Sequence, residues 1–354
     1  MLLAFGSNGS GQLGIGHEDD VSAPTRALLS RVHLEAPNIK TVAAGGNHTL
    51  LLSSDGEVFV SGDNSDGRCA QSTEEDLQSD IKFLTFYLPQ QQVQELYDFC
   101  AATWEASILV TKSGNVFSCG TGHKGELGQG EDAVQSKELR PIHGFPPTGT
   151  SVIDLAASMS HVVAVLSNGD VYGWGGGRKG QLGTKQNIIW TPRKIGGIPF
   201  KATRAVCGRE FTLVAGLPSE GQLAVLGADK WSVVSHTPPE IPGWKDIRAS
   251  WSSIYVLLES GKLLAWGRDD HGQLCPPGLP QIKEVAVGSE HVVALTASGK
   301  ILAWGWGEHG NCGEQTDANG DVKGKWNEIP IPGQAIAIGA GCATSFIEVE
   351  PNLT

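Results

Sequence analysis

Apolar and polar residues follow one recurring pattern along the chain. Each unit is a short apolar strand, a tight turn that contains glycine, and a second apolar strand that ends in glycine, which together predict a β-hairpin. A sixth copy of the unit, at 211–227, has two extra residues in its turn compared with five copies of equal length. Those five copies are each 15 residues long and align without a gap, at 48–62, 106–120, 161–175, 253–267 and 291–305. The pattern predicts a protein built from repeated hairpins.

A second glycine turn follows each hairpin, as in GSNGSGQLG (6–14) and GWGEHGNCG (305–313). It leads into a variable segment that contains proline and ends in an apolar stretch such as IKTVAAGG (39–46). We expect this segment to supply the two remaining strands of a four-stranded antiparallel blade. Two of these connections, from 227 to 253 and from 267 to 291, are near the minimum length at 26 and 24 residues.

The two ends of the chain share a further unit. The segment TSFIEVE (344–350) resembles the first half of the hairpin, and LLAFG (2–6) resembles its second half. Joining them pairs sheet edges that would otherwise be exposed. The fold class predicted is therefore all-β: one seven-bladed β-propeller over 1–354, with four-stranded antiparallel blades and the last blade closed by the N-terminal strand. A polar insertion at about 71–99, acidic at its start, is expected to be a solvated loop, with an interaction element as the alternative.

Composition and charge narrow the classes of function. The chain is 40% hydrophobic and 18% charged, has 47 glycines, and carries a formal net charge of −12 without a run of Lys or Arg. That balance gives little electrostatic support for direct binding of nucleic acid. We find no apolar run long enough for a membrane span and no secretory signal, so we expect a soluble intracellular protein. Seven cysteines without a CxxC motif predict neither disulfides nor a zinc site, and no cofactor is expected.

Comparison of equivalent positions in the repeat separates structural residues from candidates for function. Cys312 occupies a position that other units fill mostly with leucine, so we interpret it as a core residue and not as a metal ligand. His48, His161 and His291 recur where other units have alanine or phenylalanine, which favours a structural role. The alternative is that the three histidines converge on the axis as ligands.

The tryptophans divide into two groups by the same comparison. Trp174, Trp266 and Trp304 share one position at the end of a hairpin strand and are interpreted as packing between blades. Four others depart from the repeat, and the strand directions place them on one face of the disc, where exposed tryptophans are typical of binding sites. The alternative is that each folds back onto its own loop. The candidate partner-binding residues are Trp104, Trp231, Trp251 and Trp306, with Glu308, His309, Asp269, Asp270 and His271 as a polar rim.

The glycine turn and the hairpin together resemble the repeats of the regulator of chromosome condensation (RCC1-like) superfamily, whose members are seven-bladed propellers. The likeness covers essentially the whole chain. The segments AFGSNGSGQLGIGHEDD (4–20), AAGGNHTLLL (43–52), GSEH (288–291), WGWGEHGNCG (304–313) and GCAT (341–344) are similar to fungal members that partner a small CSL-type zinc protein. That resemblance implies a heterodimer with the zinc/iron protein, roles in diphthamide synthesis and in Elongator-dependent modification of tRNA wobble uridines, and a location in cytoplasm and nucleus.

Three classes of function remain open from the sequence. The first is a non-enzymatic module that binds a partner, which the aromatic face and the acidic charge favour. The second is a guanine nucleotide exchange factor for a small GTPase, as in the founding member of the superfamily. The third, an enzyme, lacks support because no GxSxG, HExxH or P-loop motif occurs. Glu210 could face the axis, but a lone glutamate beside Arg209 is more typical of a surface ion pair.

Overall fold

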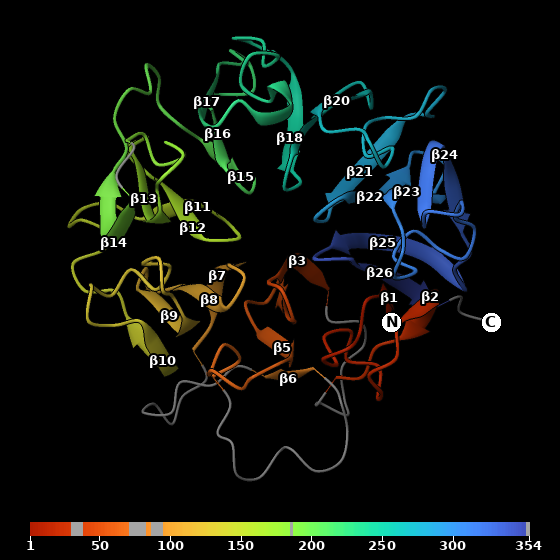
Figure 1. Ribbon diagram of the computed structural model, residues 1–354, viewed down its shortest axis with the longest axis horizontal. Coiled ribbons are helices and arrows are strands. Elements are labelled where there is room, and N and C mark those ends of the chain that lie inside the picture. The colour runs from red at the N-terminus through yellow and green to blue at the C-terminus, as the bar shows by residue number, and fades with distance from the viewer. Residues whose placement is uncertain (30–37, 71–82, 86–94, 185–186, 352–354) are drawn as a thin grey trace.

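Seven antiparallel β-sheets are arranged as blades around a central axis (Figure 1). The structure is a computed structural model, and it describes all residues except 30–37, 71–82, 86–94, 185–186 and 352–354. Each blade is a meander in which consecutive strands pair, so the connections stay short and local. The seven-bladed propeller predicted from the repeat is confirmed.

The strands of each blade follow one another from the innermost, beside the axis, to the outer edge. Blade 1 contains β3 (Ile39–Ala44), β4 (His48–Ser53), β5 (Val58–Gly62) and β6 (Leu84–Thr85). Blade 2 contains β7 (Tyr97–Ala102), β8 (Ala106–Thr111), β9 (Val116–Thr121) and β10 (Gln135–Pro141). Blade 3 contains β11 (Val152–Ser158), β12 (His161–Leu166), β13 (Val171–Gly176) and β14 (Ile188–Lys194). Blade 4 contains β15 (Arg204–Cys207), β16 (Phe211–Ala215) and β17 (Leu223–Gly227), followed by the short 3-10 helix η1 (Lys230–Ser232). Blade 5 contains β18 (Trp244–Ala249), β19 (Ser253–Leu258) and β20 (Leu263–Gly267). Blade 6 contains β21 (Ile282–Val287), β22 (His291–Thr296), β23 (Ile301–Trp306) and β24 (Asp321–Ile329). Blade 7 contains β25 (Gly333–Ala340), β26 (Thr344–Pro351), β1 (Leu2–Gly6) and β2 (Val21–Arg26).

The two ends of the chain close the ring in blade 7. The N-terminal strand β1 pairs with β26, so that Gly6 lies opposite Thr344, and the terminal amino group donates a hydrogen bond of 2.7 Å to the carbonyl of Val349. The predicted closure by the N-terminal strand is therefore confirmed. The N-terminal segment contributes a second strand as well, because β2 adds the outer edge of the same blade.

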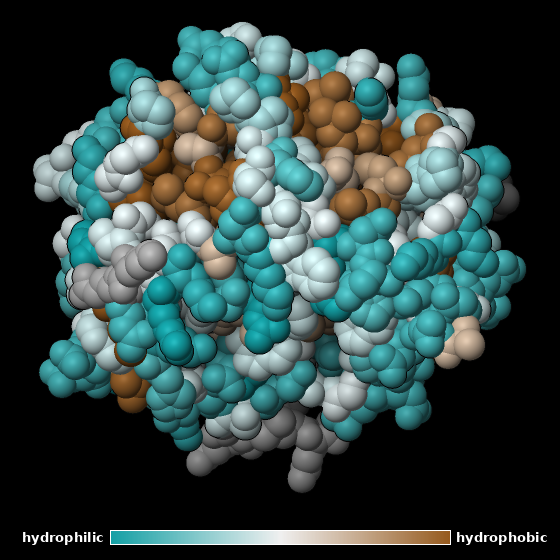
Figure 2. Space-filling view, turned by 45° about the horizontal axis from the view of Figure 1, so that its top comes forward, coloured by the Kyte–Doolittle hydropathy of each residue, from teal (hydrophilic) through white to brown (hydrophobic). Residues whose placement is uncertain are grey.

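Blades 4 and 5 have three strands each, whereas the other five blades have four. These are the blades followed by the two short connections, and each connection places a proline pair, Pro238–Pro239 or Pro276–Pro277, where an outer strand would begin. Proline has no N–H to donate to a sheet, and after β17 the chain forms only an isolated bridge, between Gln222 and Glu240, in place of a fourth strand. The apolar residues of β17 and β20 remain half-exposed as a result. Figure 2 shows two apolar areas on the side of the molecule that these blades occupy.

The predicted packing tryptophans lie in the seams between blades. Trp174 and Trp304 are fully buried, and their indole N–H groups donate to the carbonyls of Glu126 and Gln273 in the preceding blade, at 2.9 and 3.1 Å. Trp266 donates to the hydroxyl of Thr237 at 2.9 Å in the same way. The interpretation of these three residues as contacts between blades is confirmed.

The recurring histidines also lie in the seams, where Nε2 of each hydrogen-bonds a hydroxyl of the next blade. The three pairs, each at 3.0 Å, are His48 with Ser107, His161 with Thr212, and His291 with Ser345. Burial lowers the pKa of these imidazoles from 6.5 to about 3, 4 and 4 respectively. The structural role is confirmed, and the three rings do not converge on the axis.

The remaining sequence expectations divide between the core and the insertion. Cys312 is fully buried in the apolar core of blade 6, as its position in the repeat predicts. Most of the insertion at 71–99 lies outside the described residues, although 84–85 form β6 and 97–99 belong to β7. Within the part of the chain that the structure describes, no helix is both long and apolar enough to cross a membrane.

Candidate functional site

One end of the propeller carries all four tryptophans that depart from the repeat. In every blade the turn between the first two strands and the turn after the third strand emerge at this end, because the first residue of the second strand pairs with the last glycine of the third, as His291 does with Gly305. The backbone N–H of Trp306 donates to the carbonyl of Glu290 at 3.0 Å and joins the two turns. We call this end, defined by Trp104, Trp231, Trp251 and Trp306, the tryptophan face.

Trp104 and Trp251 form a pair close to the axis. They come from blades 2 and 5, and their ring centroids lie 5.8 Å apart at an angle of 51°. Backbone hydrogen bonds hold each residue between its neighbours: the N–H of Trp104 donates to Met159 at 3.0 Å, and the N–H of Trp251 donates to Ser289 at 3.0 Å. Gly46 makes room for the indole of Trp104, since a Cβ there would lie 2.6 Å from the ring. The pair thus lies across the end of the axial channel with Trp104 still 37% exposed.

Trp231 stands apart from that pair, on the turn between blades 4 and 5. Its side chain is 43% exposed, and its backbone has a φ of 60°, in the left-handed region that non-glycine residues seldom adopt. The guanidinium of Arg268 lies 5.5 Å from the centre of its ring, within the range of a cation–π contact. Arg268 also bonds Asp270 at 2.6 Å and the buried Glu290 at 3.2 Å. The exposed indole is therefore anchored to a charged network.

Trp306 lies half-buried between two histidines. Its ring centroid is 6.4 Å from that of His271 and 5.4 Å from that of His309. Each imidazole is held by a carboxylate: Nδ1 of His271 is 2.9 Å from Asp321, and Nδ1 of His309 is 2.7 Å from Asp20. Asp20 of blade 7 thus fixes the position of His309, whose side chain remains 36% exposed.

The polar rim contains residues with different roles. Partial burial disfavours the ionised form of Asp270, but hydrogen bonds from Arg268 and Gln273 outweigh it and hold the pKa of Asp270 below its usual value. Burial, in contrast, raises the pKa of Glu290. Asp269 belongs to the turn itself, because its carboxylate accepts the N–H of Leu274 at 3.0 Å. Asp269 is also exposed, so its place in the polar rim stays a prediction.

The two remaining candidates are glutamates. Glu308 is exposed on the same turn as His309. Glu210 pairs with Lys179 of the neighbouring blade at 3.6 Å, so the expected ion pair exists with a partner other than Arg209.

The tryptophans thus form two groups on one face: an axial pair, and an outer arc that runs from Trp231 through Arg268 to Trp306. The alternative that each tryptophan folds back on its own loop holds in part, since Trp306 packs against His309 of its own turn. Sequence reasoning missed Arg268, Glu290, Asp20 and Asp321. Arg268 could have been found, because it occupies in blade 5 the repeat position that Trp306 occupies in blade 6.

The face contains no arrangement with an evident chemical reaction. Among the described residues, no group of three or more His, Cys, Asp or Glu side chains could hold a metal ion. Tryptophan, arginine and histidine side chains that are partly exposed and fixed by neighbours are the composition of a protein-binding surface.

A propeller with a rigid aromatic face of this kind is a binding scaffold in its architecture. Residues 1–347 match the RCC1-like domain family, and the chain belongs to that family. It is 34% identical to RCC1 repeat-containing protein C10F6.04 of Schizosaccharomyces pombe over 99% of both chains. It is 30% identical to the mouse secretion-regulating guanine nucleotide exchange factor over 77% of this chain, an alignment that spans 61% of the mouse protein. The fold is similar to that of Saccharomyces cerevisiae Prp20p, with a TM-score of 0.80 at 21% identity over 98% of this chain and 90% of Prp20p.

Proposed function

We propose that this protein is a non-enzymatic binding propeller that covers a partner protein with its tryptophan face. The observation that carries the proposal is that four tryptophans break the repeat and all lie at one end of the disc, with Trp104 and Trp231 37% and 43% exposed. Exposed indoles are costly in water and are enriched among the residues that dominate binding energy at interfaces. Backbone contacts, cation–π contacts and carboxylates fix them before binding, which lowers the entropic cost of association.

We further propose that the partner is a small CSL-type zinc/iron protein, with which the propeller forms a heterodimer. Through this complex it would support diphthamide synthesis and, with the Elongator complex as a further partner, the modification of tRNA wobble uridines. The support is the likeness of segments such as AFGSNGSGQLGIGHEDD (4–20) to that fungal subfamily. The net charge of −12 favours action on tRNA through protein partners and not by direct contact. A location in cytoplasm and nucleus follows from the same proposal.

Affinity capture of the tagged full-length protein tests both levels of this proposal. We expect wild type to recover a small zinc or iron protein, and expect the double variant Trp251→Ala, Trp306→Ala to lose it. Alanine at an interfacial tryptophan commonly costs about 2 kcal/mol or more, which is roughly a thirtyfold loss of affinity for each. Leu217→Ala is the matched control, because Leu217 is a 49% exposed apolar side chain on the turn between β16 and β17, at the opposite end of the disc. Recovery of a different protein that depends on the same tryptophans would reject only the identity of the partner. If the same amount of partner is recovered with and without these tryptophans, the tryptophan face is not the binding surface.

A second candidate function is guanine nucleotide exchange on a small GTPase. The observation that favours it is the 30% identity to the mouse exchange factor over 77% of this chain. Release of labelled GDP from a panel of small GTPases, measured with the pure protein, distinguishes the two candidates. Accelerated release would establish exchange activity, and rates equal to the uncatalysed rate across the panel would leave binding alone as the function.

A further inference from the structure

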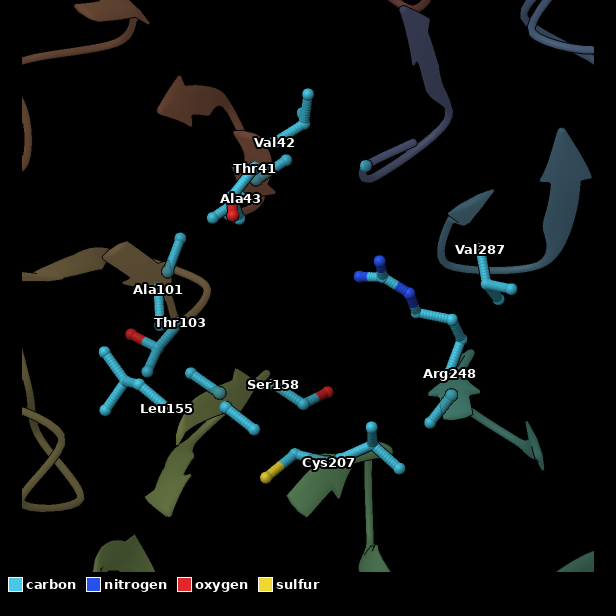
Figure 3. A pocket seen from close by; sticks show the side chains of 18 of the residues that line it. Thr41, Val42, Ala43, Ala101, Thr103, Leu155, Ser158, Cys207, Arg248 and Val287 are labelled. Atoms are coloured by element: carbon cyan, nitrogen blue, oxygen red, sulfur yellow. The ribbon is translucent and has the colours of Figure 1, made fainter. Parts of the chain in front are cut away.

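An axial channel runs between the innermost strands of all seven blades. It encloses a cavity of about 420 Å³, which lies within the range of small-molecule sites. Trp104 and Trp251 line its end at the tryptophan face. The walls consist mainly of small side chains, of which Ala43, Ala101 and Ser158 are shown in Figure 3.

At one position of the repeat, a large charged side chain replaces a small one in these walls. Arg248 on β18 pairs with the third residue of the neighbouring strand, Tyr255, and the other blades have alanine, valine or glycine at this register position. In Figure 3 the Arg248 side chain extends from β18 into the open centre of the channel. The equivalent residues are Ala43, Ala101, Ala156, Val206, Ala286 and Gly339.

The two arginines near the axis differ in how they use their donors. Arg204 directs both terminal nitrogens to protein acceptors, bonding Asp154 and Asp246 at 3.2 Å. Arg248 donates only Nε, to Asp246 at 2.7 Å, and its two terminal nitrogens have no hydrogen-bond partner among the described residues. Its side chain is 42% exposed, so those nitrogens are open to the water of the channel. A guanidinium that is held at Nε and has unpaired terminal nitrogens can donate two parallel hydrogen bonds to the two oxygens of a carboxylate or phosphate.

The charge of the channel contrasts with that of the whole chain. Three cationic side chains, Lys40, Arg204 and Arg248, and one carboxylate, Asp154, line the cavity, although the protein as a whole has a net charge of −12. Asp246, which joins the two arginines, and Glu284, whose carboxylate interacts with Arg248, neutralise part of this charge. A cation in the wall of a protein channel attracts an anion more strongly than the same cation on an open surface, because the surrounding protein has a low dielectric constant.

We propose that the axial channel binds a small organic anion, whose carboxylate or phosphate group is received by the outer nitrogens of Arg248 and whose apolar body lies against the small walls below the Trp104–Trp251 pair. Arg248 precedes Trp251 by three residues, so the charged group would lie within roughly 10 Å of the indoles. Arg248, which receives the anionic group, is not part of the tryptophan face, although Trp104 and Trp251 border both the face and the channel.

Calorimetric titration of the full-length protein with benzoate and with phenyl phosphate tests the proposal. The two probes share an aromatic body and differ in the anionic group, so they show which oxyanion the site prefers. We expect at least one to bind wild type, and expect Arg248→Ala to bind it roughly 10- to 100-fold more weakly. Arg248→Lys keeps the charge but cannot donate two parallel hydrogen bonds in fixed geometry, so we expect its affinity to be intermediate. Arg140→Ala, on the exposed outer strand β10, is the matched control and should bind like wild type.

Alanine is the residue that blades 1, 2, 3 and 6 have at this position, so Arg248→Ala is expected to fold with an unchanged melting temperature. Absence of binding of both probes to wild type up to about 10 mM would overturn the proposal, and so would equal affinities in wild type and Arg248→Ala. Neither result bears on capture of a protein partner by the tryptophan face, because Arg248 is not among the residues of that face.

Discussion

The seams between blades and the tryptophan face use the same residue types in opposite ways. In the seams, Trp304 is fully buried with one hydrogen bond, and His291 is buried with a pKa lowered to about 4. On the face, Trp306 is only half-buried, and it lies between His271 and His309, each held by a carboxylate. Residue type alone therefore does not indicate function in a repeat protein. The position of the residue in the repeat does, because a residue type that recurs at one position has the same packing role in each blade, whereas a departure from the repeat needs another explanation.

The prediction with the largest expected effect concerns the replacement of one tryptophan from each of the two regions. Trp304→Ala should lower the free energy of unfolding by about 3–5 kcal/mol, because it leaves a large cavity in the core of blade 6 and removes one of the two hydrogen bonds that the carbonyl of Gln273 accepts, the other coming from Tyr255. Trp306→Ala should lower it by about 1 kcal/mol, since this side chain keeps contact with water. Urea denaturation followed by circular dichroism measures both. Equal losses would mean that the two regions do not differ in the way that burial indicates.

The seam histidines should make stability depend on pH. Their pKa values are depressed from 6.5 to about 3–4 in the folded state, so the unfolded chain binds more protons as pH falls below 6.5. Stability is therefore complete above pH 6.5 and is lost as the pH falls towards 4, by about 1 kcal/mol per pH unit for each histidine. Unfolding in urea at a series of pH values between 7 and 4.5 measures the slope.

The matching variants are His48→Phe and His291→Phe, because blade 4 already has Phe211 at this position, packed over Gly208, and Gly45 and Gly288 lie equivalently against His48 and His291. Each replacement should reduce the histidine contribution to the slope by about a third. A slope that is unchanged in the double variant would assign acid sensitivity to other groups.

The smallest effect concerns the two groups within the face. Because Trp104 and Trp251 are in contact, their alanine variants should show a coupling free energy of about 0.5–1.5 kcal/mol in a double-mutant cycle of unfolding. The same cycle on Trp104 and Trp306, which belong to different groups, should give a coupling within about 0.5 kcal/mol of zero. Strong coupling in the second cycle would show that the face acts as one unit.

Much of the fold and part of the site were predictable, because the repeat supplied internal comparisons. Equivalent positions identified Cys312 and Trp304 as core and singled out Trp104 and Trp306. The same comparison could have found Arg248 and Arg268, which also break the repeat. Asp20 could not have been found in this way, since it lies in a variable turn and meets His309 only because blade 7 closes the ring. The missing outer strands of blades 4 and 5 were signalled by short connections with proline pairs.

The hairpin unit, the number of blades, the shared seventh blade and the face on which each turn emerges all follow from the amino-acid sequence. Those properties depend on period, turn residues and strand direction, which are local or repeat along the chain. Only the folded ring shows that Trp104 meets Trp251 across the axis and that His309 is held by Asp20. It also shows that Arg248 projects into the channel, where its two terminal nitrogens have no hydrogen-bond partner among the described residues. Such contacts depend on how the closed ring positions different blades relative to one another, and no pattern within a single blade specifies that arrangement.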